Sequence, residues 1–279
     1  MPVMLNHLVR YDPVLRLLNE TPDATVLEVG SGSEGIAYWL PGRDVTSVDP
    51  AIPGREGDAR SLDFADRSCD VAVALDMLEH IRPEERSSVL RELVRVTRRR
   101  VILGFPSGAR AFEVDVGLGR MLDRRGQTYT DWLDEHLRHG FPDASEVEAE
   151  LQAYGRVRRL PNENVHAHQT LLWCEMTRVA HRATHLLARL LAPGLRGRGR
   201  WWRARLLHLL RGADLGTPYR VILVLDLAVS SPELSRHREI ASDDVNLTAT
   251  EGVNRRIDTS QASLNGFKQL AQDPYFHMG

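Results

Sequence analysis

The residues with the clearest chemical pattern form a glycine-rich loop near the start of the chain. The segment Glu28–Gly35 reads Glu-Val-Gly-Ser-Gly-Ser-Glu-Gly and directly follows apolar residues. Its glycines match the Gly-x-Gly-x-x-Gly spacing that lets a backbone approach a pyrophosphate at the start of a helix. Two acids, Glu28 and Glu34, stand in the same segment, and residues 17–42 contain no lysine or arginine. Because carboxylates repel a pyrophosphate, the charge of the loop favours a cationic ligand.

Another acid follows the next apolar run along the chain. Asp49 stands 21 residues after Glu28, directly after the run Val45–Val48. A carboxylate at this position can accept hydrogen bonds from both ribose hydroxyls of a bound cofactor. S-adenosylmethionine combines a ribose with an ammonium and a sulfonium, and Glu28 can accept hydrogen bonds from the ammonium. The two acids together fit S-adenosylmethionine, while Asp49 alone fits a dinucleotide equally well.

Three segments resemble the class I S-adenosylmethionine-dependent methyltransferases. Glu28–Gly35 is similar to their motif I, except that Glu34 takes the usual place of the third glycine. Gly57–Asp66 resembles the segment whose acid contacts the adenine amino group, and Cys69–Ile81 closely resembles the strand-4 signature of the type 11 subgroup. The resemblance covers residues 20–106 motif by motif and implies an enzyme with S-adenosylmethionine as cofactor. It implies cofactor contacts at Glu28, Gly30, Ser31, Gly32, Asp49, Pro50, Asp58, Ala59, Asp76 and Met77.

Two histidines are candidates for catalysis. Methyl transfer is an in-line displacement at an activated carbon, so the protein aligns the acceptor and removes its proton when the acceptor is a hydroxyl. His80 follows a predicted strand at the sheet edge where open α/β folds bind ligands, and the pKa of a histidine lies near neutrality. His136 lies in Glu135–Pro142, which resembles a poorly characterised group of bacterial methyltransferases associated with glycan or secondary-metabolite pathways. Alternatively, His80 and Glu79 only position a loop, and His136 lies on a helix surface.

No metal site is predicted from the sequence. The pairs His166/His168 and His181/His185 have the spacing of metal ligands, but no third ligand is evident near either pair. Arg182 follows His181, where a zinc protease would carry a glutamate.

The elements that must position these residues alternate in the order of an α/β fold. Strand-length apolar runs are separated by helical patterns, which predicts a parallel sheet covered by helices. Together with the resemblance, this predicts a Rossmann-like class I methyltransferase fold with a seven-stranded, mostly parallel sheet, helices on both faces and an antiparallel last strand. Only eight residues separate Asp49 from Asp58, so the crossover there is predicted to be shortened. Strands are predicted at 25–29, 45–48, 71–75, 101–105, 156–160 and 219–229. One helix is predicted to begin at Pro83 and another at Ser145. Two further helices are predicted at 169–191 and 201–210.

The domain organisation follows from the same pattern. Residues 1–230 are predicted to form the methyltransferase domain, with a helical, arginine-rich insert at about 165–213 before the last strand. Residues 176–213 contain nine arginines and no acid. An amphipathic basic helix of this kind can rest on an anionic membrane surface, although most such helices pack on their own domain. Residues 231–279 lose the apolar periodicity and are predicted to form a flexible polar tail.

Composition narrows the classes of function. The chain has 279 residues, 36 basic against 38 acidic, so no overall charge favours nucleic acid as a partner. Lys268 is the single lysine, which excludes Schiff-base chemistry in practice. The two cysteines, Cys69 and Cys174, cannot form a disulfide framework, and no segment has the pattern of a signal peptide or membrane span, which favours a cytoplasmic protein.

The sequence thus predicts a methyltransferase that acts on a small-molecule or carbohydrate acceptor, at oxygen rather than nitrogen. Enzymes that methylate base amino groups typically have Asp/Asn-Pro-Pro-aromatic after strand 4, where this chain has Asp76–Glu79. Two alternatives stay open at this point: an NAD(P)-dependent oxidoreductase, and a module that binds S-adenosylmethionine without catalysis.

Overall fold

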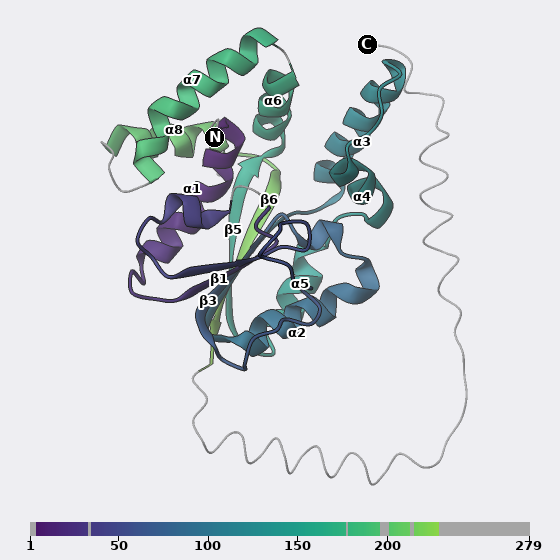
Figure 1. Cartoon of the computed structure of the whole chain (residues 1–279). Helices are drawn as coiled ribbons and strands as arrows, with labels where there is room; N and C mark the ends of the chain where they lie inside the picture. The colour runs from purple at the N-terminus through teal and green to yellow at the C-terminus, as the bar shows by residue number, and fades with distance from the viewer. Residues whose placement is uncertain (1–3, 33–34, 177, 196–200, 213–214, 229–279) are drawn as a thin grey trace, which may run out of the picture. The chain divides into compact units, whose positions relative to one another are not determined.

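A six-stranded sheet lies at the centre of the structure (Figure 1). The computed structural model describes residues 4–32, 35–176, 178–195, 201–212 and 215–228, so Glu34 and the predicted tail lie outside the described residues. The order is β2-β1-β3-β4-β6-β5, and β6 runs antiparallel to both of its neighbours while the other pairs are parallel. This confirms the mostly parallel sheet and the antiparallel last strand. The strands are β1 (Val26–Val29), β2 (Val45–Val48), β3 (Cys69–Leu75), β4 (Thr97–Pro106), β5 (Gly155–Asn164) and β6 (Pro218–Leu227).

The predicted number of seven strands is wrong for the described residues. The eight residues between Asp49 and Asp58 form tight turns instead of a helix and a further strand. The Asp49 N–H donates to the Arg55 carbonyl at 2.7 Å, and the Arg55 N–H donates to the Ile52 carbonyl at 3.0 Å. Because a crossover to a parallel strand needs a dozen or so residues, this segment is too short to add one. β2 is therefore the edge strand on this side.

Helices cover both faces of the sheet, as predicted (Figure 1). α1, α7 and α8 cover one face, and α2 and α5 cover the other. The helices are α1 (Leu5–Asn19), α2 (Arg86–Val96), α3 (Ala109–Arg124), α4 (Asp131–His139), α5 (Ala144–Leu151), α6 (Val165–Met176), α7 (Arg178–Leu195) and α8 (Trp201–Arg211). Short 3-10 helices are η1 (Ile36–Trp39), η2 (Leu78–His80) and η3 (Pro83–Glu85).

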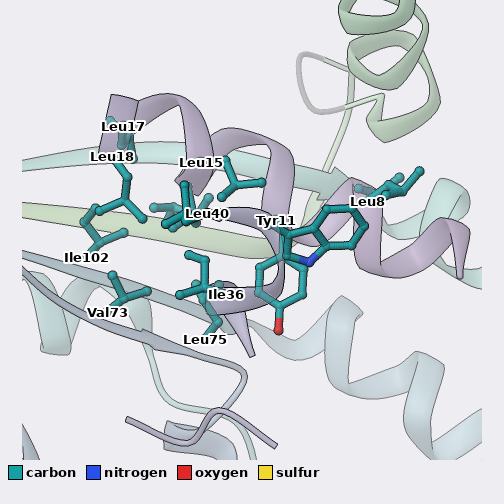
Figure 2. Packing of buried hydrophobic residues seen from close by; sticks show 14 of the residues in the cluster. Leu8, Tyr11, Leu15, Leu17, Leu18, Ile36, Leu40, Val73, Leu75 and Ile102 are labelled. Carbon is teal, nitrogen blue, oxygen red and sulfur yellow. The ribbon is translucent and has the colours of Figure 1, made fainter. Parts of the chain in front are cut away.

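Alternating strand residues divide the core into two layers, because successive side chains of a strand point to opposite faces. Val73 and Ile102 belong to the layer under α1, and Figure 2 shows Leu15 and Leu18 of α1 close to them. The next residue, Leu103, belongs to the layer under α2 and α5. Both layers are apolar, so the sheet is a buried scaffold and polar groups gather at its ends.

Two predicted helix boundaries are wrong. α5 begins at Ala144 because Asp143 caps it, with its Oδ1 accepting from the N–H groups of Ser145 at 2.7 Å and Glu146 at 3.1 Å. The predicted capping box that started at Ser145 is therefore not the cap. The helix predicted at 169–191 is two helices, α6 and α7.

The arginine-rich insert consists of α6, α7 and α8, between β5 and β6. Leu191 and Leu207 are fully buried under it, so it covers part of the sheet. Leu186, Leu190 and Leu209 are exposed by 70%, 50% and 72%. The insert therefore has an inner apolar face that packs on its own domain. We call its exposed leucines, Leu186, Leu190 and Leu209, the outer strip. Within the described residues, no helix is both long and apolar enough to cross a membrane.

The parallel strands bring the predicted site residues to one edge of the sheet. β1, β2, β3 and β4 run in the same direction, so their carboxyl ends meet there. Gly30, Asp49 and Asp76 each directly follow one of these strands. This edge is where ligands bind in open α/β folds.

Candidate active site

Two glycines shape the loop after β1. Gly30 has φ +76° and Gly32 has φ +57°, a backbone conformation that glycine adopts easily and other residues rarely adopt. A Cβ added to Gly30 would lie 2.6 Å from the Cγ of Met77, so a larger residue does not fit between the loop and the end of β3. A Cβ added to Gly32 would meet no atom within 4 Å. The structure thus brings Gly30 and Met77 together and leaves open space beside Gly32.

Glu28 lies beneath this loop and is only 2% exposed. Its two oxygens accept hydrogen bonds from the Ile36 N–H at 2.9 and 2.8 Å, and the Ser47 hydroxyl donates to Oε2 at 3.3 Å. Burial raises the pKa of Glu28 to about 7, because the cost of burying a charge outweighs these hydrogen bonds. Glu28 therefore fixes the start of η1 against β2. Its contact with the ammonium of a cofactor stays a prediction.

Asp49 joins the end of β2 to the glycine loop. Its Oδ2 accepts from the Gly32 N–H at 2.7 Å, and its Oδ1 accepts from the Ala51 N–H at 2.9 Å. Ser31, which precedes Gly32 in the loop, is buried, and Pro50, which follows Asp49, is exposed. Because a carboxylate oxygen can accept two hydrogen bonds, each oxygen keeps capacity for a ribose hydroxyl. The open space at Gly32 next to this carboxylate fits the expected cofactor.

Asp58 and Ala59 follow the shortened crossover close to the end of β2, since a Cβ added to Gly57 would lie 2.4 Å from Val48 Cγ1. Asp58 is exposed, and its carboxylate accepts from Arg60 Nη2 at 2.7 Å, while Arg60 Nη1 donates to Glu85 at 2.5 Å. Ala59 is half-buried. The carboxylate of Asp58 is thus engaged on the surface, and the adenine contact that the resemblance implies stays a prediction.

Asp76 belongs to a buried ion-pair network. Arg220 of β6 binds both of its oxygens, at 2.5 and 2.7 Å, and Arg10 of α1 binds Oδ2 at 3.1 Å. Burial alone would raise the pKa of Asp76, but the charges of Arg220 and Arg10 outweigh it and lower that pKa. Arg220 also donates to Glu163 at 2.6 Å, and Glu163 lies 3.1 Å from His168. Asp76 therefore connects β3 to α1, β5 and β6.

Three side chains with metal- or proton-binding atoms converge just after this network. Glu79 and His80 lie on η2, and His136 lies on α4. One ligand atom from each of the three lies within 4.8 Å of the other two, and His136 Nε2 is 4.0 Å from Glu79 Oε1. Glu79 is 1% exposed, and neither of its oxygens accepts a hydrogen bond from another described residue. We call these three residues the Glu79 cluster.

Carboxylates hold both imidazoles of the cluster from behind. Asp115 of α3 lies 2.6 Å from His136 Nδ1, and Glu135 lies 2.6 Å from His80 Nδ1. A carboxylate beside Nδ1 keeps a proton there, so Nε2 carries the lone pair. His136 Nε2 is buried and has no hydrogen-bond partner among the described residues.

The surroundings also shift the protonation of the Glu79 cluster. Burial, together with the negative charge of Asp76, raises the pKa of Glu79 well above its usual range. Burial and the neighbouring His136 lower the pKa of His80, although Glu135 opposes the shift. His80 is therefore uncharged at neutral pH.

A cleft of about 530 Å³ lies between α3, α6 and the residues that precede β6, and none of its described lining residues belongs to the Glu79 cluster. Its lining includes Arg110 and Glu113 of α3 and His166 and Gln169 of α6. Its apolar wall includes Val114, which packs with Tyr219 and Phe141, and the Phe141 ring lies 5.3 Å from that of His136. The cleft thus joins charged and amide groups to the neighbourhood of His136.

The structure brings six of the twelve predicted site residues into contact, as three pairs. Contacts join Gly30 with Met77 and Gly32 with Asp49, and His80 and His136 have ring centroids 4.8 Å apart. The interpretation of His136 as a surface residue is wrong, because it is 6% exposed.

Sequence reasoning missed several supporting residues. Arg220 is a buried charge in the apolar part of a strand, and Asp115 is a buried acid between two valines of α3. The available signal was a charged residue in an element that is predicted to be buried. Because a buried charge needs a partner of opposite charge, such a residue indicates an ion pair. Glu135 carried no such signal, because it stands in a polar stretch.

Comparisons with known proteins give one family match and several solved structures of similar fold. Residues 27–105, from β1 to the end of β4, match the family model described as a methyltransferase domain. The comparison with curated proteins finds no match. Solved structures with a similar fold include a protein from Pyrococcus horikoshii OT3, with 20% identity, TM-score 0.42, and coverage of 57% of this chain and 85% of that one.

Two further solved structures are similar over comparable lengths. A putative methyltransferase from an antibiotic biosynthesis pathway of Anabaena variabilis has 17% identity and TM-score 0.47, covering 80% of this chain and 98% of that one. The magnesium protoporphyrin IX methyltransferase of Synechocystis, with bound S-adenosylhomocysteine, has 18% identity and TM-score 0.38, covering 58% and 76%. These scores are low, so the assignment rests on the family match and on the residues at the sheet edge.

The family match contains the features that the resemblance singled out. It includes the glycine loop, Asp49 and the segment Cys69–Ile81, which the structure places at one edge of the sheet. It favours a methyltransferase over an NAD(P)-dependent oxidoreductase or a non-catalytic module. The chain therefore contains a methyltransferase domain, and the match supports a class I S-adenosylmethionine-dependent enzyme with S-adenosylmethionine as its methyl donor.

Proposed function

We propose that this methyltransferase acts on a hydroxyl oxygen of a small molecule or carbohydrate. The observation that carries the proposal is the orientation of His136. Asp115 holds its Nδ1 at 2.6 Å, and its buried Nε2 has no hydrogen-bond partner among the described residues. An imidazole held in this way can take a proton, and a hydroxyl acceptor must lose one. An amine acceptor that reacts uncharged has less need of a base at this place.

The chain's own residues divide the work between the two ends of the site. When bound, S-adenosylmethionine supplies a sulfonium-activated methyl group, which the acceptor oxygen takes while the C–S electron pair stays on sulfur. The loop at Gly30 and Gly32, together with Asp49, holds the cofactor. His80 and His136 promote loss of the acceptor proton. Glu135 and Asp115 are positioning residues, because each acts through an imidazole.

The cleft supports a small polar acceptor. A volume of about 530 Å³ falls in the range of small-molecule sites. Its lining combines Arg110, Glu113 and Gln169, which can bind hydroxyl groups as donors and acceptors. The formal net charge of -2 gives the whole chain no attraction to nucleic acid. The cysteine usage of the sequence supports a location in the reducing cytosol.

The test is an acceptor screen with isotope-labelled S-adenosylmethionine. The purified chain is incubated with phenols, polyols, mono- and oligosaccharides, amines and transfer RNA, and products are located by fragmentation in mass spectrometry. We expect a gain of one CH2 group on an acceptor oxygen. Labelling only at nitrogen, or only of RNA, would overturn the proposal.

Variants connect the activity to the site. His136→Gln should lower kcat by about 10²-fold or more, the usual loss when a general base is removed. His181→Gln, on α7, removes an imidazole outside the site and should leave kcat unchanged. An unchanged kcat in His136→Gln would argue against the proposed role of that histidine.

The cofactor end is tested by calorimetric titration with S-adenosylhomocysteine. Gly30→Ala should weaken binding by more than about tenfold, because its Cβ would lie 2.6 Å from Met77 Cγ and its φ is +76°. Gly42→Ala is the matched control, since Gly42 also has positive φ, at +84°, but no atom within 4 Å of an added Cβ. Equal affinity in the two variants would contradict a cofactor site at this loop.

A further inference from the structure

The Glu79 cluster leaves three electron-rich atoms facing one another in the interior. Glu79 is 1% exposed and has two oxygens without a hydrogen bond from another described residue. His136 Nε2 is also buried without a hydrogen-bond partner among those residues, 4.0 Å from Glu79 Oε1. A separation of 4.0 Å is too long for a hydrogen bond between them. Buried polar groups without partners are costly, so an arrangement of this kind needs something between its members.

We infer that Glu79, His80 and His136 bind a divalent transition-metal ion. Two imidazoles and one carboxylate form a ligand set typical of Zn²⁺, Mn²⁺ or Fe²⁺, and unlike the all-oxygen sites of Mg²⁺ and Ca²⁺. One ligand atom from each residue lies within 4.8 Å of the others. Ligands of a tetrahedral zinc ion lie roughly 3.3 Å apart, so the ion draws the three together by about 1 Å.

The residues behind the imidazoles match what a metal site needs. Metal-binding histidines usually donate their second ring N–H to a carboxylate, which fixes the tautomer and orients the ring. Both histidines of the cluster have such a partner at 2.6 Å, Asp115 for His136 and Glu135 for His80. Asp115 is itself held by the Tyr219 hydroxyl, which donates to it at 3.2 Å. The Nε2 atoms of the two histidines are therefore unprotonated and oriented to bind a metal ion.

The charge balance of the surroundings also favours a cation. Asp76 is the acid nearest to Glu79 in the sequence, and it already forms ion pairs with Arg10 and Arg220. Among the described residues, neither guanidinium group forms a hydrogen bond or an ion pair with Glu79, although both attract its charge through space. A divalent ion would supply the positive charge that the Glu79 carboxylate lacks.

Three protein ligands leave at least one coordination position for water or for an oxygen of the acceptor. A metal ion lowers the pKa of a bound hydroxyl, whose proton then passes to water. The histidines would then assist proton loss through the ion instead of taking the proton themselves. This role rests on the proposed function, whereas the metal site itself does not.

The test measures metal binding in the absence of cofactor and acceptor. The chain is treated with a chelator, dialysed and titrated with ZnCl2, MnCl2 and MgCl2 by calorimetry. We expect one Zn²⁺ or Mn²⁺ ion per chain and much weaker binding of Mg²⁺. Glu79→Gln and His136→Gln should weaken binding at least about tenfold, and Asp115→Asn by about 10- to 100-fold. The control is the double variant His181→Gln, His185→Gln, which removes the other helical pair and should bind normally.

A second measurement protects the test against variants that do not fold. X-ray absorption of the zinc-loaded wild-type chain should show a first shell of imidazole nitrogens and oxygen, without sulfur. No stoichiometric binding by the wild-type chain would overturn the inference, as would binding that is lost in the α7 control and kept in His136→Gln. Either result leaves the acceptor screen, and thus the proposed function, to be judged separately.

Discussion

At the scale of single residues, the site depends on acids whose surroundings differ. Among the described residues, no cationic side chain forms a hydrogen bond with the buried Glu28, and burial raises its pKa to about 7. Asp76 is buried between two arginines, which lower its pKa. The same functional group thus titrates near neutral pH in one position and stays charged in the other, because only the second has arginines in direct contact.

Glu28→Gln should change how stability depends on pH. A folded pKa raised above the unfolded value gives stability that is fully present at pH values below about 4.5 and is lost as the pH rises through about 7. We therefore expect the wild-type chain to lose about 2–3 kcal/mol of unfolding free energy from this group between pH 5 and pH 8. The glutamine variant should not show that loss, as measured by urea unfolding at both pH values. Glu84→Gln, at an exposed position, is the control and should follow the wild-type curve.

At the scale of elements, one buried arginine joins four of them. Arg220 at the start of β6 binds Asp76 after β3 and Glu163 at the end of β5, and Asp76 in turn binds Arg10 of α1. Asp76 and Glu163 both have positive φ, +49° and +60°. The ion pairs therefore hold two strained backbone positions, one after β3 and one in the last part of β5, at the edge of the sheet where the site lies.

Arg220→Met should destabilise the protein strongly. The substitution keeps an apolar stem but leaves two buried carboxylates with fewer positive partners, which typically costs about 3–5 kcal/mol. Arg138→Met is the control, because Arg138 and Asp134 form an exposed pair worth less than about 1 kcal/mol. Urea unfolding of both variants measures the difference, and equal stability would show that the network contributes little. Asp76→Asn in the Arg220→Met background should recover part of the loss.

At the scale of the whole molecule, the insert α6–α8 has two faces. Its inner leucines complete the core, whereas Leu186, Leu190 and Leu209 are exposed on the outside. The exposed arginines Arg182 and Arg189 flank the outer strip. Apolar side chains among arginines are typical of helices that contact anionic membrane surfaces.

We expect the wild-type chain to co-sediment with vesicles that contain phosphatidylserine, and less so at high salt. Leu186→Glu combined with Leu190→Glu should abolish that binding without unfolding the chain, because both side chains are exposed. Leu215→Glu, 71% exposed but outside the insert, is the matched control and should bind as the wild type does. Absence of wild-type binding at low salt would argue against a membrane contact at this surface.

The sequence by itself determined the elements that local patterns encode. Apolar runs between turn residues predicted the strands, and the buried strand β3 contains the predicted residues 71–75, because a buried parallel strand needs a continuous apolar stretch. The motifs from Glu28 to Ile81 determined the family and the cofactor, since they lie in order on consecutive elements. The helix α1 was not predicted, although it buries Leu8 and Leu18 completely. Its interior proline, Pro13, weakens the local signal for a helix.

Only the tertiary structure decided which polar residues meet. Asp76 and Arg220 are far apart in the chain, and their contact exists because β6 enters the sheet antiparallel to β4. The same holds for Glu79 and His136, which the packing of α4 against η2 brings together. A sequence states which residue types are present, but burial and partners set the charge of each one. For that reason the loop and the fold were predictable, whereas the ion-pair network and the Glu79 cluster were not.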